Sequence, residues 1–250
     1  TQFRVHYKCF VDRDIELVWN IFCYSVYSHQ NEIKNGFVTM GSGHRVGICG
    51  TAVSIHGEIN SVRDISSLNI RIAREIPNAS AELLRRVGKL DGGLLIVGMP
   101  CSGKTTILRD LARRISLGID CRIMRTSVVD ERSELSGTYA GISKNDLGLA
   151  DILNGYSKAD GIMQALRTLS PEAIICDEIG ASSDMQAIEQ GVNAGVSIIA
   201  TIHAESYHEL LSRNQGKALI GTGAFKTIVI LDSRENVGKI KELIRLRGAK

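Results

Sequence analysis

Residues 98–105 of the chain read Gly98-Met99-Pro100-Cys101-Ser102-Gly103-Lys104-Thr105. This stretch matches in full the pattern of a phosphate-binding loop, in which two glycines flank four residues and a lysine and a threonine follow. The surrounding sequence fits as well, because the apolar run 94–97 precedes the stretch and a helical pattern over 104–117 follows it. A chance glycine-rich turn would not have these neighbours. The stretch therefore predicts a phosphate site between a strand and a helix.

The residue types in this loop suit the chemistry of phosphate binding. Gly98 and Gly103 allow backbone N–H groups to turn towards phosphate oxygens, and the start of the helix adds a favourable dipole. Lys104 is predicted to reach the β- and γ-phosphates of a nucleotide, and the Thr105 hydroxyl to bind Mg²⁺. The predicted nucleotide-binding residues are Gly98, Met99, Pro100, Cys101, Ser102, Gly103, Lys104, Thr105 and Thr106.

Two adjacent acids follow the apolar run 173–176. Because the carboxyl ends of parallel strands face the ligand crevice, Asp177 and Glu178 are expected near the phosphate loop. Asp177 is predicted to hold Mg²⁺ through water, and Glu178 to polarise the attacking water. An Asp-Glu pair also occurs in solvated turns, so its place downstream of a phosphate loop carries the argument. The pattern predicts a nucleotide hydrolase.

Polar residues follow two further predicted strands. The strand predicted at 122–129 ends in the charged run 130–134, and the strand predicted at 196–202 ends in Thr201-Ile202-His203-Ala204. We expect both ends at the same edge of the sheet, where polar groups can orient water or sense the γ-phosphate. His203 is the more specific candidate, although a histidine that only satisfies hydrogen bonds is the alternative interpretation.

Downstream of Gly92-Gly93, strand-like and helical patterns alternate along the chain. Such alternation predicts an α/β fold whose parallel sheet is covered by helices on both faces. The predicted strands cover 94–97, 122–129, 173–176 and 196–202, and the predicted helices cover 104–117, 162–169, 184–194 and 205–212. Two later strands, 227–231 and 240–246, are predicted to pair with each other.

The first third of the chain has a different pattern. Apolar residues recur at helical spacing over 15–26, with Asp12 as the N-cap, and predict a helix. The runs 37–40 and 46–53 flank a glycine-rich break and predict a hairpin. Strict alternation over 68–72 predicts a half-buried strand.

Pro77 and Asn78 interrupt the chain before a short predicted helix over 79–87. We therefore predict two domains. A smaller α/β domain covers 1–78, and the nucleotide-binding domain covers 79–250.

Composition excludes several classes of protein. The formal charge of +3 is too small, and the basic residues too dispersed, for a dedicated nucleic-acid binder. The six cysteines form no CxxC pair, which favours reduced thiols in a cytosolic protein over a disulfide frame or a zinc site. No apolar run approaches the length of a membrane span, and we see no secretory signal. The chain starts at Thr1, so we expect residues upstream of it.

These residues resemble the secretion ATPases of bacterial type II and type IV systems, and more closely the stage III sporulation protein AA family of endospore-forming bacteria. The resemblance extends over nearly the whole chain. Besides the phosphate loop, it rests on the stretches 43–47, 67–75, 130–134, 137–141, 145–148, 177–180 and 201–204.

The resemblance implies a RecA-like P-loop ATPase core with a parallel sheet, preceded by a smaller α/β domain. It implies a homo-oligomeric ring, taken as a hexamer, that binds ATP and Mg²⁺ between neighbouring subunits and hydrolyses the ATP. It also implies partners in a membrane channel or secretion complex. The protein would then work at the cytoplasmic face of a membrane, in the mother cell of the sporulating bacterium.

The resemblance also implies roles for individual residues. In secretion ATPases an acidic element after the second strand of the core contributes to the catalytic site, and Glu131 and Glu134 match it. The histidine element of that family matches His203. Arginines on the domain that precedes the core act on the nucleotide, and Arg71 and Arg74 match that strand.

Three functions stay open at this point. They are a ring-forming ATPase motor, a P-loop ATPase stimulated by nucleic acid, and a nucleotide-gated binding module with little turnover. Glu178 disfavours the binding module, because it supplies a base for hydrolysis. The modest charge and the aromatic content of 5% disfavour a groove for single-stranded nucleic acid. The choice of ATP over GTP rests on the resemblance.

Overall fold

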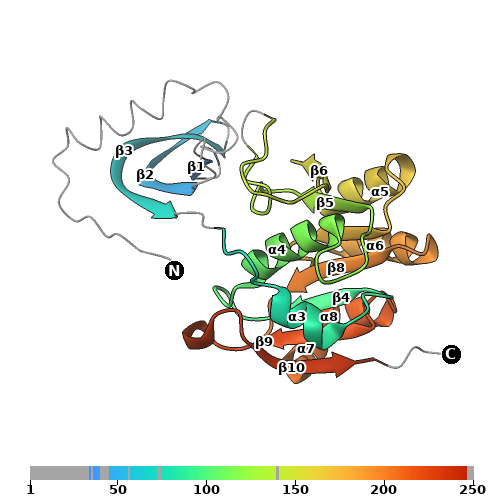
Figure 1. The fold of residues 1–250 in the computed structure, drawn as a ribbon. Coiled ribbons are helices and arrows are strands. Elements are labelled where there is room, and N and C mark those ends of the chain that lie inside the picture. Colours follow the sequence, from blue (N-terminus) through green and yellow to red (C-terminus); the bar gives the residue numbers. More distant parts are fainter. Residues whose placement is uncertain are drawn as a thin grey trace. The chain divides into compact units, whose positions relative to one another are not determined.

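The computed structural model forms two compact units (Figure 1). The smaller unit takes residues 1–74 and 137–144, and the larger unit takes 75–136 and 145–250. The structure describes residues 34, 36–39, 45–55, 57–71, 75–138 and 141–246. The predicted helix over 15–26 lies outside the described residues. The sequence-based domain limits, 1–78 and 79–250, stay a prediction.

The described part of the smaller unit is an antiparallel sheet in the order β1-β2-β3. Its strands are β1 (Phe37–Thr39), β2 (Arg45–Ile55) and β3 (Glu58–Arg71). The pairing of β1 with β2 confirms the predicted hairpin. The strand predicted at 68–72 is the end of a much longer strand. Its first half was missed because 58–67 is largely polar and exposed, so pairing with β2 determines its conformation and periodicity does not.

The larger unit is built on a seven-stranded sheet in the order β10-β9-β4-β8-β7-β5-β6. The strands are β4 (Leu94–Val97), β5 (Thr126–Asp130), β6 (Asp151–Asn154), β7 (Ala173–Cys176), β8 (Ser197–Ile202), β9 (Thr227–Leu231) and β10 (Ile240–Arg245). All neighbours are parallel except β10, which pairs antiparallel with β9. The predicted α/β fold with a mainly parallel sheet is therefore confirmed.

Helices cover both faces of this sheet (Figure 1). They are α3 (Ala81–Val87), α4 (Lys104–Leu117), α5 (Lys158–Thr168), α6 (Ser182–Asn193), α7 (Tyr207–Ser212), α8 (Asn214–Gly221) and the short 3₁₀ helix η1 (Arg234–Asn236). Along β4, Leu94 and Ile96 join one buried cluster with α3 and α4. Leu95 and Val97 join the other cluster, with α5 to α8. A strand buried on both faces explains why its sequence is continuously apolar.

Several elements differ from the prediction in extent or existence. β5 begins at Thr126 and not at the predicted 122, because most of 122–125 is exposed and unpaired with the sheet. The edge strand β6 and the helix α8 were not predicted, and β6 carries too few buried side chains to show a strand pattern. Helix α5 begins at Lys158, earlier than predicted, because Ser157 caps it by accepting from the Asp160 N–H. No helix among the described residues is long and apolar enough to cross a membrane.

The order of strands sets the geometry of the site. β8 lies between β4, which leads into the phosphate loop, and β7, which leads into the acids. The three strands are parallel, so their carboxyl ends meet at one edge of the sheet. The ends of β8 and β7 are thereby brought beside the phosphate loop.

Candidate nucleotide site

The phosphate loop connects β4 directly to α4. Cys101 and Gly103 have positive φ angles of 67° and 97°. A Cβ atom on Gly98 would lie 2.5 Å from Ser102 Oγ, and one on Gly103 would lie 3.1 Å from the Gly238 nitrogen. Gly98 is therefore required by the packing of the phosphate loop on itself, and Gly103 by its positive φ angle and by its contact with Gly238. A tight glycine-containing turn of this kind suits a backbone cradle for phosphate.

The side chain of Lys104 is nearly buried, with 6% of its surface exposed. Its Nζ atom donates to the carbonyls of Gly98 at 2.7 Å and Met99 at 3.0 Å, and lies 2.9 Å from His203 Nδ1. Burial lowers the pKa of Lys104, and the nearby carboxylates of Asp177 and Glu178 oppose that shift. All three ammonium donors are thus engaged by groups that a phosphate oxygen can replace.

The predicted magnesium ligands lie together. Thr105 Oγ1 donates to Asp177 Oδ2 at 2.8 Å, and Thr201 Oγ1 donates to Asp177 Oδ1. The same Thr201 oxygen accepts from the Glu178 N–H at 2.8 Å. A hydroxyl beside a carboxylate is a donor set that suits Mg²⁺, which prefers oxygen ligands. The residues present therefore fit a bound Mg²⁺–nucleotide.

Glu178 has a backbone conformation that is rare for its type, with φ at 50°. Such conformations cost energy and cluster at functional sites. Its Oε1 atom contacts His203 Nε2, and Arg132 lies 3.9 Å from Oε2. The structure thus brings together the predicted base and the predicted histidine.

His203 links Lys104 to Glu178. An ammonium group only donates, so Nδ1 of His203 must accept from Lys104. We infer that the imidazole proton lies on Nε2, which donates to Glu178 Oε1. One neutral ring thus joins the predicted phosphate-binding lysine to the predicted base.

The acids at the end of β5 bond to groups of their own turn and of α5, and not to the phosphate loop. Asp130 is buried and accepts from the N–H groups of Glu134, at 2.9 Å, and Ser136, at 2.7 Å, so it shapes the turn that follows the strand. Glu131 forms an ion pair with Lys158 of α5. The catalytic roles that the resemblance implies for Glu131 and Glu134 stay predictions; the Glu134 backbone lies in the turn that Asp130 holds.

The predicted arginines lie at the limit of the described residues. Arg71 ends β3, and its side chain is not described. Arg74 lies outside the described residues. The prediction that one of them acts on nucleotide in a neighbouring subunit therefore stays a prediction.

Comparison with known proteins establishes the family of this chain. The family described as "Sporulation stage III, protein AA" matches residues 11–250. The chain belongs to this family. Stage III sporulation protein AA of Bacillus subtilis (strain 168) is 39% identical over 223 residues, which cover 88% of this chain and 73% of that protein.

Solved structures show that this family member shares its fold with the ATPase DotB and the pilus retraction motor PilT. The ATPase DotB of Yersinia pseudotuberculosis matches with a TM-score of 0.54 at 18% identity, over 87% of this chain and 62% of DotB. The pilus retraction motor PilT with bound ADP matches with a TM-score of 0.54 at 16% identity, over 84% of this chain and 64% of PilT. The chain spans less than two thirds of either ATPase. At these identities the likeness establishes a shared fold, and the predicted RecA-like core is confirmed in that sense.

Two contributors to this family member's site were not among the residues predicted as catalytic or ligand-binding. Thr201, which the sequence indicates less specifically than His203, bonds both Asp177 and Glu178. Arg132 approaches Glu178 from the loop after β5. It lies within the charged run 130–134, in which only the acids were predicted to contribute.

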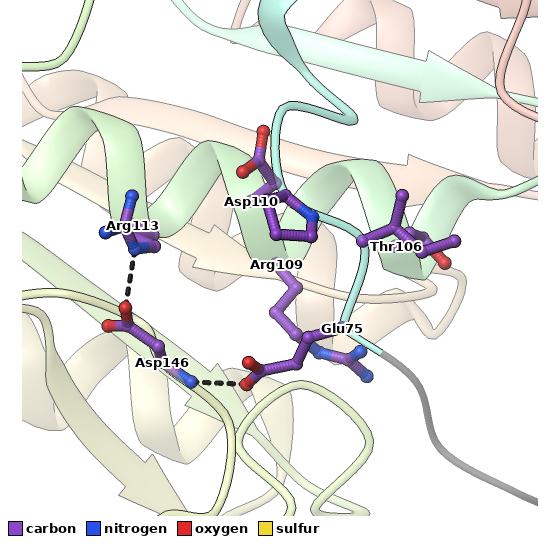
Figure 2. Close-up of a pocket in the computed structure, with 8 residues that line it drawn as sticks. Glu75, Thr106, Arg109, Asp110, Arg113 and Asp146 are labelled. Carbon is purple, nitrogen blue, oxygen red and sulfur yellow. Dashed lines mark hydrogen bonds and ion pairs between the residues drawn. The ribbon is translucent and has the colours of Figure 1, made fainter.

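Beside the phosphate loop, a cavity of about 170 Å³ runs along α4 (Figure 2). Two hydrogen bonds join residues that line it: the Asp146 N–H donates to Glu75 Oε1 at 2.6 Å, and Arg113 Nε donates to Asp146 Oδ2 at 2.5 Å. Thr106, predicted to bind nucleotide, is among its lining residues, Glu75, Ile76, Pro77, Thr106, Arg109, Asp110, Arg113 and Asp146. Thr106 therefore lies between the phosphate loop and this cavity.

Proposed function

We propose that this chain hydrolyses ATP, works as a homo-oligomeric ring, and powers a secretion-like channel or its assembly during sporulation. The observation that carries the hydrolase proposal is the connected path from Lys104 through His203 to Glu178. A module that only holds nucleotide has no need of a carboxylate linked in this way to its phosphate-binding lysine.

The path suggests how phosphate contact controls the base. In this structure Lys104 donates to His203, and His203 donates to Glu178. A γ-phosphate oxygen draws the ammonium of Lys104 away, so His203 loses its donor and is free to turn. Glu178 is then released to accept a proton from the attacking water. Hydrolysis therefore waits until the triphosphate is seated.

Thr105 and Asp177 would hold Mg²⁺, whose charge offsets that of the phosphate oxygens when it is bound with the nucleotide. Thr201 fixes the Asp177 carboxylate and the Glu178 backbone with a single hydroxyl group. These two acids therefore keep a defined position relative to each other, which hydrolysis of a positioned phosphate requires.

Turnover is tested by measuring phosphate release from Mg²⁺–ATP by the wild-type protein. We expect release with ATP and only weak stimulation by single-stranded DNA. A large stimulation would favour a nucleic-acid-driven ATPase. No release under any condition in which a fluorescent ATP analogue binds would favour a nucleotide-gated module.

The ring is proposed from the resemblance to secretion ATPases, with Arg71 or Arg74 completing the site of a neighbouring subunit. Light scattering with and without a non-hydrolysable ATP analogue gives the particle mass, which we expect to be that of a hexamer. Mixing Arg71→Ala with Lys104→Ala subunits is expected to restore part of the activity. If mixed particles stay inactive, the sites are not shared.

Membership of the sporulation family supports the proposed cellular role. We propose that the ring docks on membrane channel proteins at the cytoplasmic face of the mother-cell membrane. Co-purification of those proteins with the ring from sporulating cells tests this. Capture that is equal from vegetative cells would contradict it.

A further inference from the structure

The loop between β9 and β10, residues 232–239, packs against the phosphate loop. Arg234 Nε donates to the Pro100 carbonyl at 3.1 Å, and the Gly238 N–H donates to the Ser102 carbonyl at 2.9 Å. Gly103 meets the same loop, since a Cβ there would lie 3.2 Å from a methyl carbon of Val237. Arg234 and Pro100 are 134 positions apart in the chain. The phosphate loop therefore takes part of its shape from a distant segment.

The β9–β10 loop has a defined shape of its own. The Asp232 N–H donates to the Lys239 carbonyl at 2.9 Å and closes the loop. The Asp232 carboxylate accepts from the Ser233 N–H at 2.7 Å and from Asn236 Nδ2 at 2.9 Å. A backbone and a side-chain hydrogen bond of this kind lower the pKa of Asp232. These hydrogen bonds hold the β9–β10 loop in one conformation, so it can keep the phosphate loop in place.

A phosphate cradle needs partners for its carbonyls as well as its N–H groups. The N–H groups must point at the phosphate, so the carbonyls have to be satisfied by other groups. Here Lys104 donates to the carbonyls of Gly98 and Met99. The β9–β10 loop donates to the carbonyls of Pro100 and Ser102. When Lys104 turns to a phosphate, the contacts from the β9–β10 loop persist.

We propose that Arg234 is a positioning residue that holds the phosphate loop in its phosphate-binding shape, acting through the Pro100 carbonyl together with the Gly238 N–H. The inference rests on the proposed function, because it concerns the same nucleotide site. Arg234 acts on affinity, since it orders the loop before phosphate arrives. The chemical step depends on Glu178 and His203, and it proceeds at its normal rate once nucleotide is bound.

Three variants test this role. Arg234→Met keeps the length of the stem without a donor, Arg234→Lys restores a donor, and Arg167→Ala removes an exposed arginine from α5 as the matched control. The readouts are the Kd of a fluorescent non-hydrolysable ATP analogue with Mg²⁺, and the KM and kcat of ATP hydrolysis. We expect Arg234→Met to weaken Kd and KM by about three- to tenfold, the effect of losing one hydrogen bond from a charged group, with kcat within about twofold. Arg234→Lys should recover most of the affinity, and Arg167→Ala should bind as the wild type does.

Two further measurements separate the hydrogen bond from other effects of the arginine. A purely electrostatic attraction fades at 1 M salt, where the Debye length is about 3 Å, so we expect the loss in Arg234→Met to persist there. Inorganic tripolyphosphate should displace the analogue less well from Arg234→Met, in the same proportion as Kd changes. Unchanged binding of tripolyphosphate would show that Arg234 contacts the nucleoside and would overturn the proposal.

The outcomes distinguish this inference from the proposed function. If the wild type binds the analogue, Lys104→Ala does not, and Arg234→Met binds as tightly as the wild type, the role of Arg234 is overturned and the nucleotide site stands. A lower melting temperature of Arg234→Met with unchanged Kd would also overturn it. If the wild type binds no analogue, the proposed function fails, and this inference fails with it.

Discussion

Two neighbouring strands of the sheet end in the same pair of residues, with different results. β7 leads into Asp177-Glu178, and β5 ends in Asp130 followed by Glu131. Asp177 bonds the phosphate-loop residue Thr105, whereas Asp130 accepts from backbone groups of its own turn. The same dipeptide at the same edge of one sheet therefore lies beside the phosphate loop in one strand, whereas in the other its aspartate holds a turn and its glutamate pairs with Lys158.

Distance from the phosphate loop explains the difference. β7 is the second strand from β4 and β5 is the third, so at a spacing of about 4.8 Å they lie roughly 10 and 15 Å from β4. Between β4 and β7, Thr201 of β8 reaches the Asp177 side chain. Side chains at the end of β5 have closer partners in their own turn and in α5. A position at the carboxyl edge of the sheet is thus not sufficient to bring a residue into contact with the phosphate loop.

The largest expected effect follows from removing the lysine that both phosphate and His203 engage. Lys104→Ala loses a charge-assisted contact to the nucleotide, so we expect affinity for the fluorescent ATP analogue to fall by about 100-fold or more. Arg167→Ala, an exposed arginine on α5, is the control for lost positive charge. Equal affinities of Lys104→Ala and the wild type would show that the phosphate loop does not bind the nucleotide through this lysine.

Thr201→Val tests whether the hydroxyl between β4 and β7 is what distinguishes the two strand ends. The substitution keeps the side-chain shape but leaves Asp177 Oδ1 and the Glu178 N–H without this partner. We expect kcat to fall by about 10-fold, because both groups are only partly buried and lose the hydrogen bond that positions them. Thr201→Ser retains the hydroxyl and should keep most of the activity. If Thr201→Val hydrolyses ATP normally, the positions of the two acids do not depend on β8.

Glu131→Gln measures how far the second strand end contributes to catalysis. Its ion pair with Lys158 is partly exposed, so its loss should change stability by less than about 1 kcal/mol. The resemblance to secretion ATPases implies a catalytic contribution, and we expect kcat to fall by about three- to tenfold, from initial rates at saturating ATP. Lys158→Met breaks the same ion pair and controls for it. A fall in kcat as large as that of Glu178→Gln would show that the ends of β5 and β7 contribute equally to catalysis.

The smallest effect on turnover is expected from Asp130→Asn. Asp130 is buried and accepts hydrogen bonds from the turn 134–136, so an amide there should lower the free energy of unfolding by about 1–3 kcal/mol. Turnover per folded molecule should stay within about twofold of the wild type. Chemical denaturation and rate measurements on the same sample check both parts. A large loss of turnover with unchanged stability would give Asp130 a role at the nucleotide.

The parts of the site that sequence predicted are those whose signals are local. The phosphate loop, the apolar run of β4 and the start of α4 are contiguous, and the structure has them at the predicted residues. The order of strands is not local, so no pattern could place β8 between β4 and β7. The contact of Arg234 with Pro100 and the turn around Asp130 likewise depend on which segments meet in the folded chain. Residue type and spacing predicted the candidates at strand ends, and packing decided which of them meet the loop.

The central claim is that Glu178 acts as the base of a site whose phosphate contact is Lys104. The most direct test is to measure analogue binding and phosphate release from Mg²⁺–ATP in Glu178→Gln beside the wild type. We predict that binding stays within about threefold, because Glu178 does not hold phosphate, and that kcat falls by about 10²- to 10⁴-fold, the usual contribution of a general base. Hydrolysis at the wild-type rate by Glu178→Gln would contradict this account.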